Sequence, residues 1–169
     1  MDTGWKNSLW NQFGAAIDML ESALTACPEE LWRSRSQQQE FWYEIYHCLF
    51  WLDLYLSGSV EGFAPPAPFG LEELDPAGLL PERPYTKNEL RAYLEHGREK
   101  CRATIESLTD AKARRSCKFP WGEVSFLELL LYNLRHVQGH AAELLWILGE
   151  KTGAAPGWVG RAKGGGGGK

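Results

Sequence analysis

The sequence predicts an all-α protein, a four-helix bundle with a long connection between its second and third helices. Three observations support this fold class. Four long segments carry apolar residues at helical spacing. Each of them begins and ends at residues that commonly start or stop helices, and no segment shows a convincing strand pattern. Residues 1–153 are expected to form this single domain. Residues 154–169, which end in a glycine run, are expected to form a flexible tail.

The first helix is predicted over residues 5–26, because its apolar side chains recur in steps of four and three along one stripe: Leu9, Phe13, Ala16, Leu20 and Ala23. It stops at Cys27, since the residue before a proline is disfavoured in a helix. The second helix is predicted to begin near Ser36 or Gln37. It ends at Gly58, a residue that suits a left-handed helix cap.

The connection of residues 59–85 cannot be one continuous helix, because it holds six of the nine prolines. It also carries large apolar side chains, so we expect it to pack over the domain and to cover a site. The third helix opens with a capping box at Thr86 and Glu89. The fourth opens with a second capping box at Ser125 and Glu128.

Composition excludes several classes of protein. The chain has 169 residues, enough for one domain with a core, and its net charge of -4 gives no reason to expect a nucleic-acid partner. No apolar run reaches the ~20 residues that cross a bilayer, and the N-terminus lacks a secretory layout. We therefore expect no membrane partner and a cytoplasmic location. The four cysteines have no zinc-finger spacing and are expected to be free thiols: Cys27, Cys48, Cys101 and Cys117.

Two histidines of the fourth helix, His136 and His140, lie at positions where the apolar pattern predicts leucine. They are four residues apart and therefore share one helix face. A third histidine, His47, falls on the core-facing stripe of the second helix. Three neutral imidazoles can hold one divalent ion and leave positions open for water or substrate, and zinc, nickel and iron(II) all accept such ligands. The sequence therefore predicts a transition-metal site at these histidines, with hydrogen-bonded core histidines as the alternative.

Three polar residues near the histidines are candidates to assist them. Asn133 and Glu143 flank the histidine pair on the same helix face, where either could orient an imidazole. Glu143 could instead be a fourth ligand or a base. Tyr43 lies one turn before His47 and could donate its hydroxyl to a bound ligand. The alternatives are solvent exposure for Asn133 and Glu143, and simple packing for Tyr43.

The segment around His47 (F-W-Y-E-I-Y-H-C-L-F-W-L-D-L-Y-L) and the later H-x-x-x-H (N-L-R-H-V-Q-G-H-A-A-E-L) resemble the DinB-like superfamily, DinB/YfiT-type metalloproteins, over about residues 5–150. The resemblance implies a four-helix bundle whose three histidines bind a divalent metal, often nickel or zinc, and frequent homodimers. Characterised members include transferases and isomerases that use low-molecular-weight thiols such as mycothiol or bacillithiol. Members often carry glutamine where this chain has Glu143.

Two functional hypotheses follow from the sequence. The first is a divalent-metal-binding protein that acts as a metal-dependent hydrolase or thiol transferase on a small molecule held under the 59–85 connection. The second is a non-enzymatic helical bundle that binds a ligand or a partner helix and whose histidines are structural. The sequence does not decide whether turnover occurs.

Overall fold

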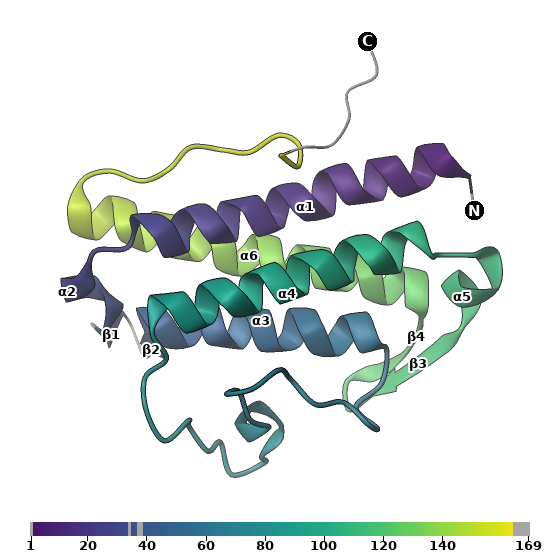
Figure 1. The fold of residues 1–169 in the computed structure, drawn as a ribbon, viewed down its shortest axis with the longest axis horizontal. Coiled ribbons are helices and arrows are strands. Elements are labelled where there is room, and N and C mark those ends of the chain that lie inside the picture. Colours follow the sequence, from purple (N-terminus) through teal and green to yellow (C-terminus); the bar gives the residue numbers. More distant parts are fainter. Residues whose placement is uncertain (1, 34, 37–38, 164–169) are drawn as a thin grey trace.

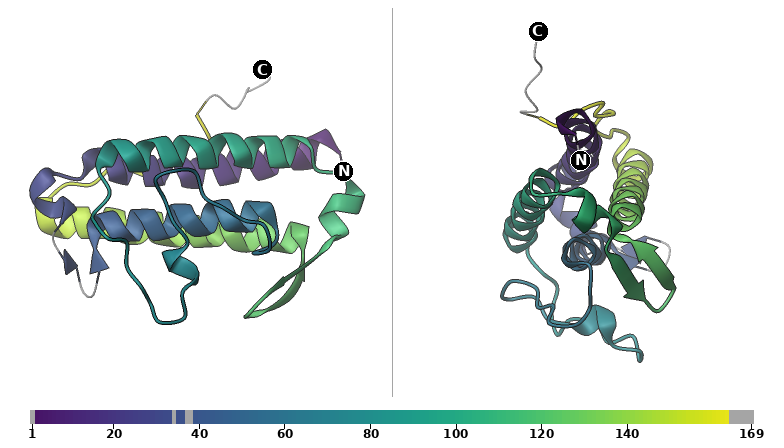
Figure 2. Two further views of the ribbon diagram at one scale, coloured as in Figure 1. Left: turned by 60° about the horizontal axis from the view of Figure 1, so that its bottom comes forward. Right: turned by 90° about the vertical axis from the view of Figure 1, so that its right-hand side faces the viewer.

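The computed structural model describes residues 2–33, 35–36 and 39–163, and four long helices make up most of this part of the chain (Figure 1). They are α1 (Thr3–Ala26), α3 (Phe41–Ser57), α4 (Lys87–Glu106) and α6 (Phe126–Thr152). Helix α1 packs against α6 and α4, and α3 packs against the same two helices, so the four enclose one apolar core, seen end-on in Figure 2. The predicted mainly helical fold is confirmed.

Most helix ends lie where local sequence signals place them. Thr86 and Glu89 form the predicted capping box of α4, and Gly58 and Gly153 cap α3 and α6 with φ of 74° and 75°. Helix α3 begins at Phe41, later than predicted. The preceding residues pair instead as two short antiparallel strands, β1 (Arg35–Ser36) and β2 (Gln39–Glu40). Of the two predicted start residues, Ser36 thus lies in β1 and Gln37 lies outside the described residues.

The prediction that the chain has no strand is wrong between α4 and α6. A short helix, α5 (Asp110–Arg114), leads into an antiparallel hairpin of β3 (Ser116–Phe119) and β4 (Gly122–Ser125). Burial alternates along β3, where Cys117 and Phe119 point inward. Four residues are too few for this alternation to stand out in the sequence. Pro120, which argues against helix, lies in the two-residue turn.

The connection after α3 packs on the helices, as predicted. It includes a helical turn, η1 (Glu72–Leu74), and a buried aromatic side chain, Phe69. The Phe69 ring stacks on Tyr93 of α4 with centroids 4.3 Å apart and on Tyr46 of α3 with centroids 6.0 Å apart. The connection is thereby fixed across α3 and α4, which holds η1 against the helix that carries His47.

Residues 154–163, expected to begin a flexible tail, lie extended along α1 (Figure 1). Ala162 is buried, and its N–H donates to the Asn11 carbonyl at 2.9 Å. Its side chain occupies the space that Gly14 leaves, since a Cβ on Gly14 would lie 2.5 Å from that of Ala162. The Lys163 N–H donates to the buried Asp18 carboxylate at 2.7 Å. The glycine run itself, residues 164–169, lies outside the described residues.

None of the helices within the described residues combines the length and the apolar character that crossing a membrane requires.

Candidate metal centre

The three histidines singled out in the sequence come together between α3 and α6. The ring centroid of His47 lies 5.5 Å from that of His136 and 5.0 Å from that of His140, and the latter two are 4.5 Å apart. One nitrogen of each ring lies within 4.8 Å of the others. Two nitrogens bound to one ion by bonds of ~2.1 Å lie up to about 4.2 Å apart, so side-chain shifts of under about 1 Å bring this set to bonding distance.

Two of the three rings have a carboxylate beside Nδ1. The Nδ1 of His47 is 2.7 Å from Glu73 Oε2 of the η1 turn, which leaves its Nε2 for a metal. The Nδ1 of His140 lies 3.3 Å from Glu44 Oε2 of α3, but it forms no hydrogen bond within the described residues. The hydrogen bond between His47 and Glu73 is of the kind that fixes a metal-binding imidazole in one tautomer and orientation.

His136 differs from the other two histidines, because no carboxylate of the described residues pairs with its Nδ1. Its Nδ1 is buried and has no hydrogen-bond partner among the described residues. Burial, and then the neighbouring imidazoles of His140 and His47, lower the pKa of His136 to about 3. The ring is therefore neutral at physiological pH, which is the form that binds metals. A metal ion would supply the partner that a buried, unpaired ring nitrogen lacks, so the donor set fits a divalent ion.

The three predicted assisting residues lie in different settings. Asn133 is buried, but its Nδ2 donates to the Leu52 carbonyl at 3.0 Å, so it joins α6 to α3 rather than orienting a histidine. Glu143 is exposed, and its carboxylate lies within 4.8 Å of ligand atoms of His140 and Glu44. Tyr43 is half-buried beside His47, and burial with the Glu73 and Glu44 carboxylates raises its pKa, so its hydroxyl keeps its proton.

Sequence reasoning missed both carboxylates that accompany the histidines. Glu44 carries a usable signal, because it is the one charged residue in F-W-Y-E-I-Y-H and lies three residues before His47. Glu73 carries none, because it lies in the irregular connection, where no periodicity assigns a direction to a side chain. Burial alone would raise the pKa of Glu73, but hydrogen bonds from His47, Tyr43 and Trp51 hold it below its ordinary value. The carboxylate is therefore ionised at neutral pH.

Aromatic side chains border the cluster on the side of the β3–β4 hairpin. The Tyr55 ring of α3 meets His136 edge-on with centroids 6.2 Å apart. Trp121 of the hairpin turn stacks on Tyr132 of α6 at 4.6 Å, and both contact Tyr55. The hairpin thus adds an aromatic side chain to the apolar surroundings of the histidines. Polar contacts in apolar surroundings are stronger than in water.

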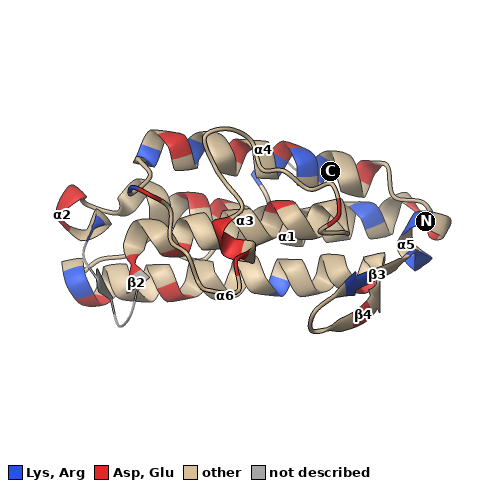
Figure 3. Ribbon diagram, turned by 90° about the horizontal axis from the view of Figure 1, so that it is seen from below, with Lys and Arg blue, Asp and Glu red and all other residues tan. Residues whose placement is uncertain are grey.

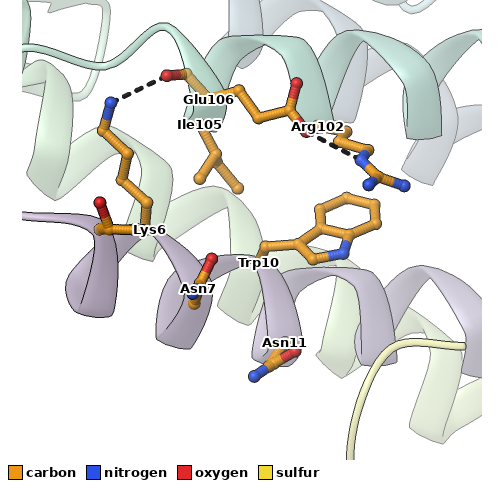
Figure 4. A pocket seen from close by; sticks show the side chains of 8 residues that line it. Lys6, Asn7, Trp10, Asn11, Arg102, Ile105 and Glu106 are labelled. Atoms are coloured by element: carbon orange, nitrogen blue, oxygen red, sulfur yellow. Dashed lines mark hydrogen bonds and ion pairs between the residues drawn. The ribbon is translucent and has the colours of Figure 1, made fainter. Parts of the chain in front are cut away.

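A separate hollow of about 340 Å³ lies between α1 and α4 (Figure 4). Its charged side chains already have partners: Lys6 Nζ donates to the backbone carbonyl of Glu106 at 2.8 Å, and Arg102 Nε pairs with the Glu106 carboxylate at 3.0 Å. The Arg102 guanidinium lies 5.5 Å from the centre of the Trp10 ring. These contacts connect α1 to α4 across the hollow, so we do not take it as the candidate site.

The fold and the histidine cluster define a mainly helical protein with a candidate divalent-metal centre. The family model of the DinB superfamily matches residues 12–144, which include all three histidines, and the chain belongs to that superfamily. Members often bind divalent metals, in keeping with the candidate site found here. A comparison with curated proteins finds no match.

Proposed function

We propose that the protein binds one divalent transition metal ion, zinc, nickel or iron(II), through His47, His136 and His140. The supporting observation is that one nitrogen of each ring lies within 4.8 Å of the others, while Glu73 engages the outer nitrogen of His47. Three histidine ligands leave coordination positions for water or substrate. The proposal includes the DinB/YfiT-type four-helix bundle as the architecture that brings α3 and α6 together.

The reaction proposed for this centre is either hydrolysis of a small molecule, with water as the second substrate, or transfer of a group from that molecule to the sulfur of a low-molecular-weight thiol, which gives up its proton. A bound divalent ion lowers the pKa of a coordinated thiol or water, so that the nucleophilic form exists near neutral pH. The exposed carboxylate of Glu143 is suited to accept the proton that the thiol releases, and the protonated Tyr43 hydroxyl is suited to donate a hydrogen bond to the small substrate. Glu44 places a carboxylate oxygen 3.3 Å from His140 Nδ1.

A homodimer is part of the same proposal. An apolar groove of about 440 Å³ runs between α1 and α6, lined mainly by Trp5, Leu9, Leu127, Leu131 and Leu134. Trp5 and Leu131 are among the exposed large apolar side chains, and a second copy of this face would cover them. Light scattering should give twice the monomer mass, and Leu131→Glu should restore the monomer mass. A monomer at all concentrations would exclude this interface.

Elemental analysis tests the metal site directly. The protein purified without chelator should carry one equivalent of a transition metal, and His47→Ala, His136→Ala and His140→Ala should each lose most of it. His96→Ala is the matched control, because His96 lies outside the cluster and its Nε2 is 3.4 Å from the carboxylate of Asp53. A folded wild-type protein that neither carries nor takes up metal would reject the proposal. Loss of thiol-dependent turnover in Glu143→Gln, with metal content unchanged, would support the proposed reaction.

A further inference from the structure

A carboxylate from the 59–85 connection reaches the candidate metal centre. Glu73 lies in η1, which rests over α3 (Figure 3), and its side chain is only 5% exposed. Its Oε2 lies 2.7 Å from His47 Nδ1 and accepts the Trp51 indole N–H at 2.9 Å. Both donors belong to α3 and lie one turn apart, so a single oxygen fixes η1 to the helix face that carries His47.

We propose that Glu73 is a positioning residue that couples the fold of the 59–85 connection to metal occupancy at His47. This inference rests on the proposed metal site. By accepting the Nδ1–H, the carboxylate holds the His47 ring in the tautomer that presents Nε2 as a ligand. Trp51 in turn holds the carboxylate, because its indole donates to the same oxygen.

Coupling between two events is reciprocal. If the docked Glu73 raises the affinity for the metal by some factor, the bound metal must favour the docked state of η1 by that same factor. Loss of a carboxylate behind a metal-binding histidine typically lowers metal affinity by about 10- to 100-fold. The expected stabilisation of η1 by metal is therefore of about the same size. Its reporters are the Leu74 and Asp75 amides, which donate to the Leu71 and Glu72 carbonyls at 2.9 and 3.0 Å.

The chain offers a matched pair of substitutions within one turn. Glu73→Gln removes the charge and places an NH₂ group among N–H donors, with no change in size. Glu72→Gln makes the same chemical change one residue earlier, where the carboxylate accepts from Tyr46 at 3.4 Å and pairs with none of the histidines of the described chain. Trp51→Phe keeps a ring in place and removes only the second donor to Glu73. It also keeps the inference testable if Glu73→Gln does not fold.

The experiment measures the zinc affinity of the metal-free full-length chain by competition with a chromophoric chelator. It also measures hydrogen exchange at the backbone amides of residues 71–75 with and without zinc. Glu73→Gln should bind zinc about 10- to 100-fold more weakly and lose the zinc-dependent slowing of exchange. Trp51→Phe should show a smaller loss, and Glu72→Gln should match the wild type. Equal affinity and equal protection in wild type and Glu73→Gln would overturn the inference while leaving the metal site intact. Absence of zinc binding by the wild type would overturn the proposed function instead.

Discussion

Replacing His136 by leucine should affect the metal-free and metal-bound protein in opposite ways. The buried Nδ1 of His136 has no partner within the described part of the chain, and a buried polar group left unpaired costs about 1–3 kcal/mol. Leucine fills a similar volume without that cost, so the free energy of unfolding of the metal-free variant should rise by this amount. For a domain of this size, a rise of 1–3 kcal/mol corresponds to a gain in Tm of about 2–12 °C.

Zinc should have the reverse effect. At a free concentration of 100 times Kd, a ligand that binds only the folded state adds about 2.7 kcal/mol, or about 5–11 °C in Tm. The wild type should show this gain and His136→Leu should not. Thermal unfolding followed by circular dichroism, in EDTA and in zinc, measures both quantities, with His96→Ala as the control that keeps the zinc response.

Two results would refute this reasoning. A variant less stable than the wild type in EDTA would show that the imidazole has a stabilising partner, as the structural-histidine hypothesis requires. A variant that still gains stability from zinc would show that the ion does not depend on His136.

Three further predictions concern the helices and the core. Burial raises the pKa of Cys27 to about 12 and also raises the pKa of Cys48, Cys101 and Cys117, so at pH 8 all four thiols should react with a thiol reagent only in denaturant. Because the unfolded thiols ionise near pH 9 and the folded ones do not, the free energy of unfolding should fall as pH rises above about 9. A thiol that reacts quickly in the native protein would contradict this burial. Gly14→Ala should lower the free energy of unfolding by about 1–3 kcal/mol and speed proteolysis of residues 154–163, since the new Cβ would meet Ala162. The control is Gly139→Ala, where a Cβ meets open space in the described structure. Measured by chemical denaturation in the presence of EDTA, this variant should be as stable as the wild type or more stable. Thr86→Ala should cost about 1 kcal/mol in chemical denaturation through loss of the α4 cap, and an unchanged midpoint would show that the cap contributes nothing.

Features encoded over a few neighbouring residues could be predicted from the sequence. The capping box at Thr86 and Glu89 and the caps at Gly58 and Gly153 depend on local backbone chemistry. The convergence of the histidines follows from periodicity, because apolar stripes of two helices pack on each other and histidines on both stripes must then face one region. This is why residues 89 positions apart, His47 and His136, could be assigned to one site from the sequence.

Features that depend on irregular backbone could not be predicted. The direction of Glu73 is set by how the connection folds over α3, which the stacking of Phe69 on Tyr93 helps to fix. The strands of the β3–β4 hairpin are too short for their alternation of buried and exposed residues to be recognised in a mainly helical sequence. Asn133 has the spacing of a histidine partner, but the nearby Leu52 carbonyl accepts its amide instead.

The buried Asp18 carboxylate of α1 has a consequence for where the folding unit ends. It accepts from the Arg98 guanidinium of α4 and from the Lys163 amide, although the family match stops at residue 144. A shortened chain ending after α6 would keep every histidine and the segment that matches the family. It would nevertheless remove one hydrogen-bond donor, the Lys163 amide, from the buried Asp18 carboxylate. Any reporter or affinity sequence joined after residue 163 would also emerge beside the middle of α1 instead of from an end of the molecule.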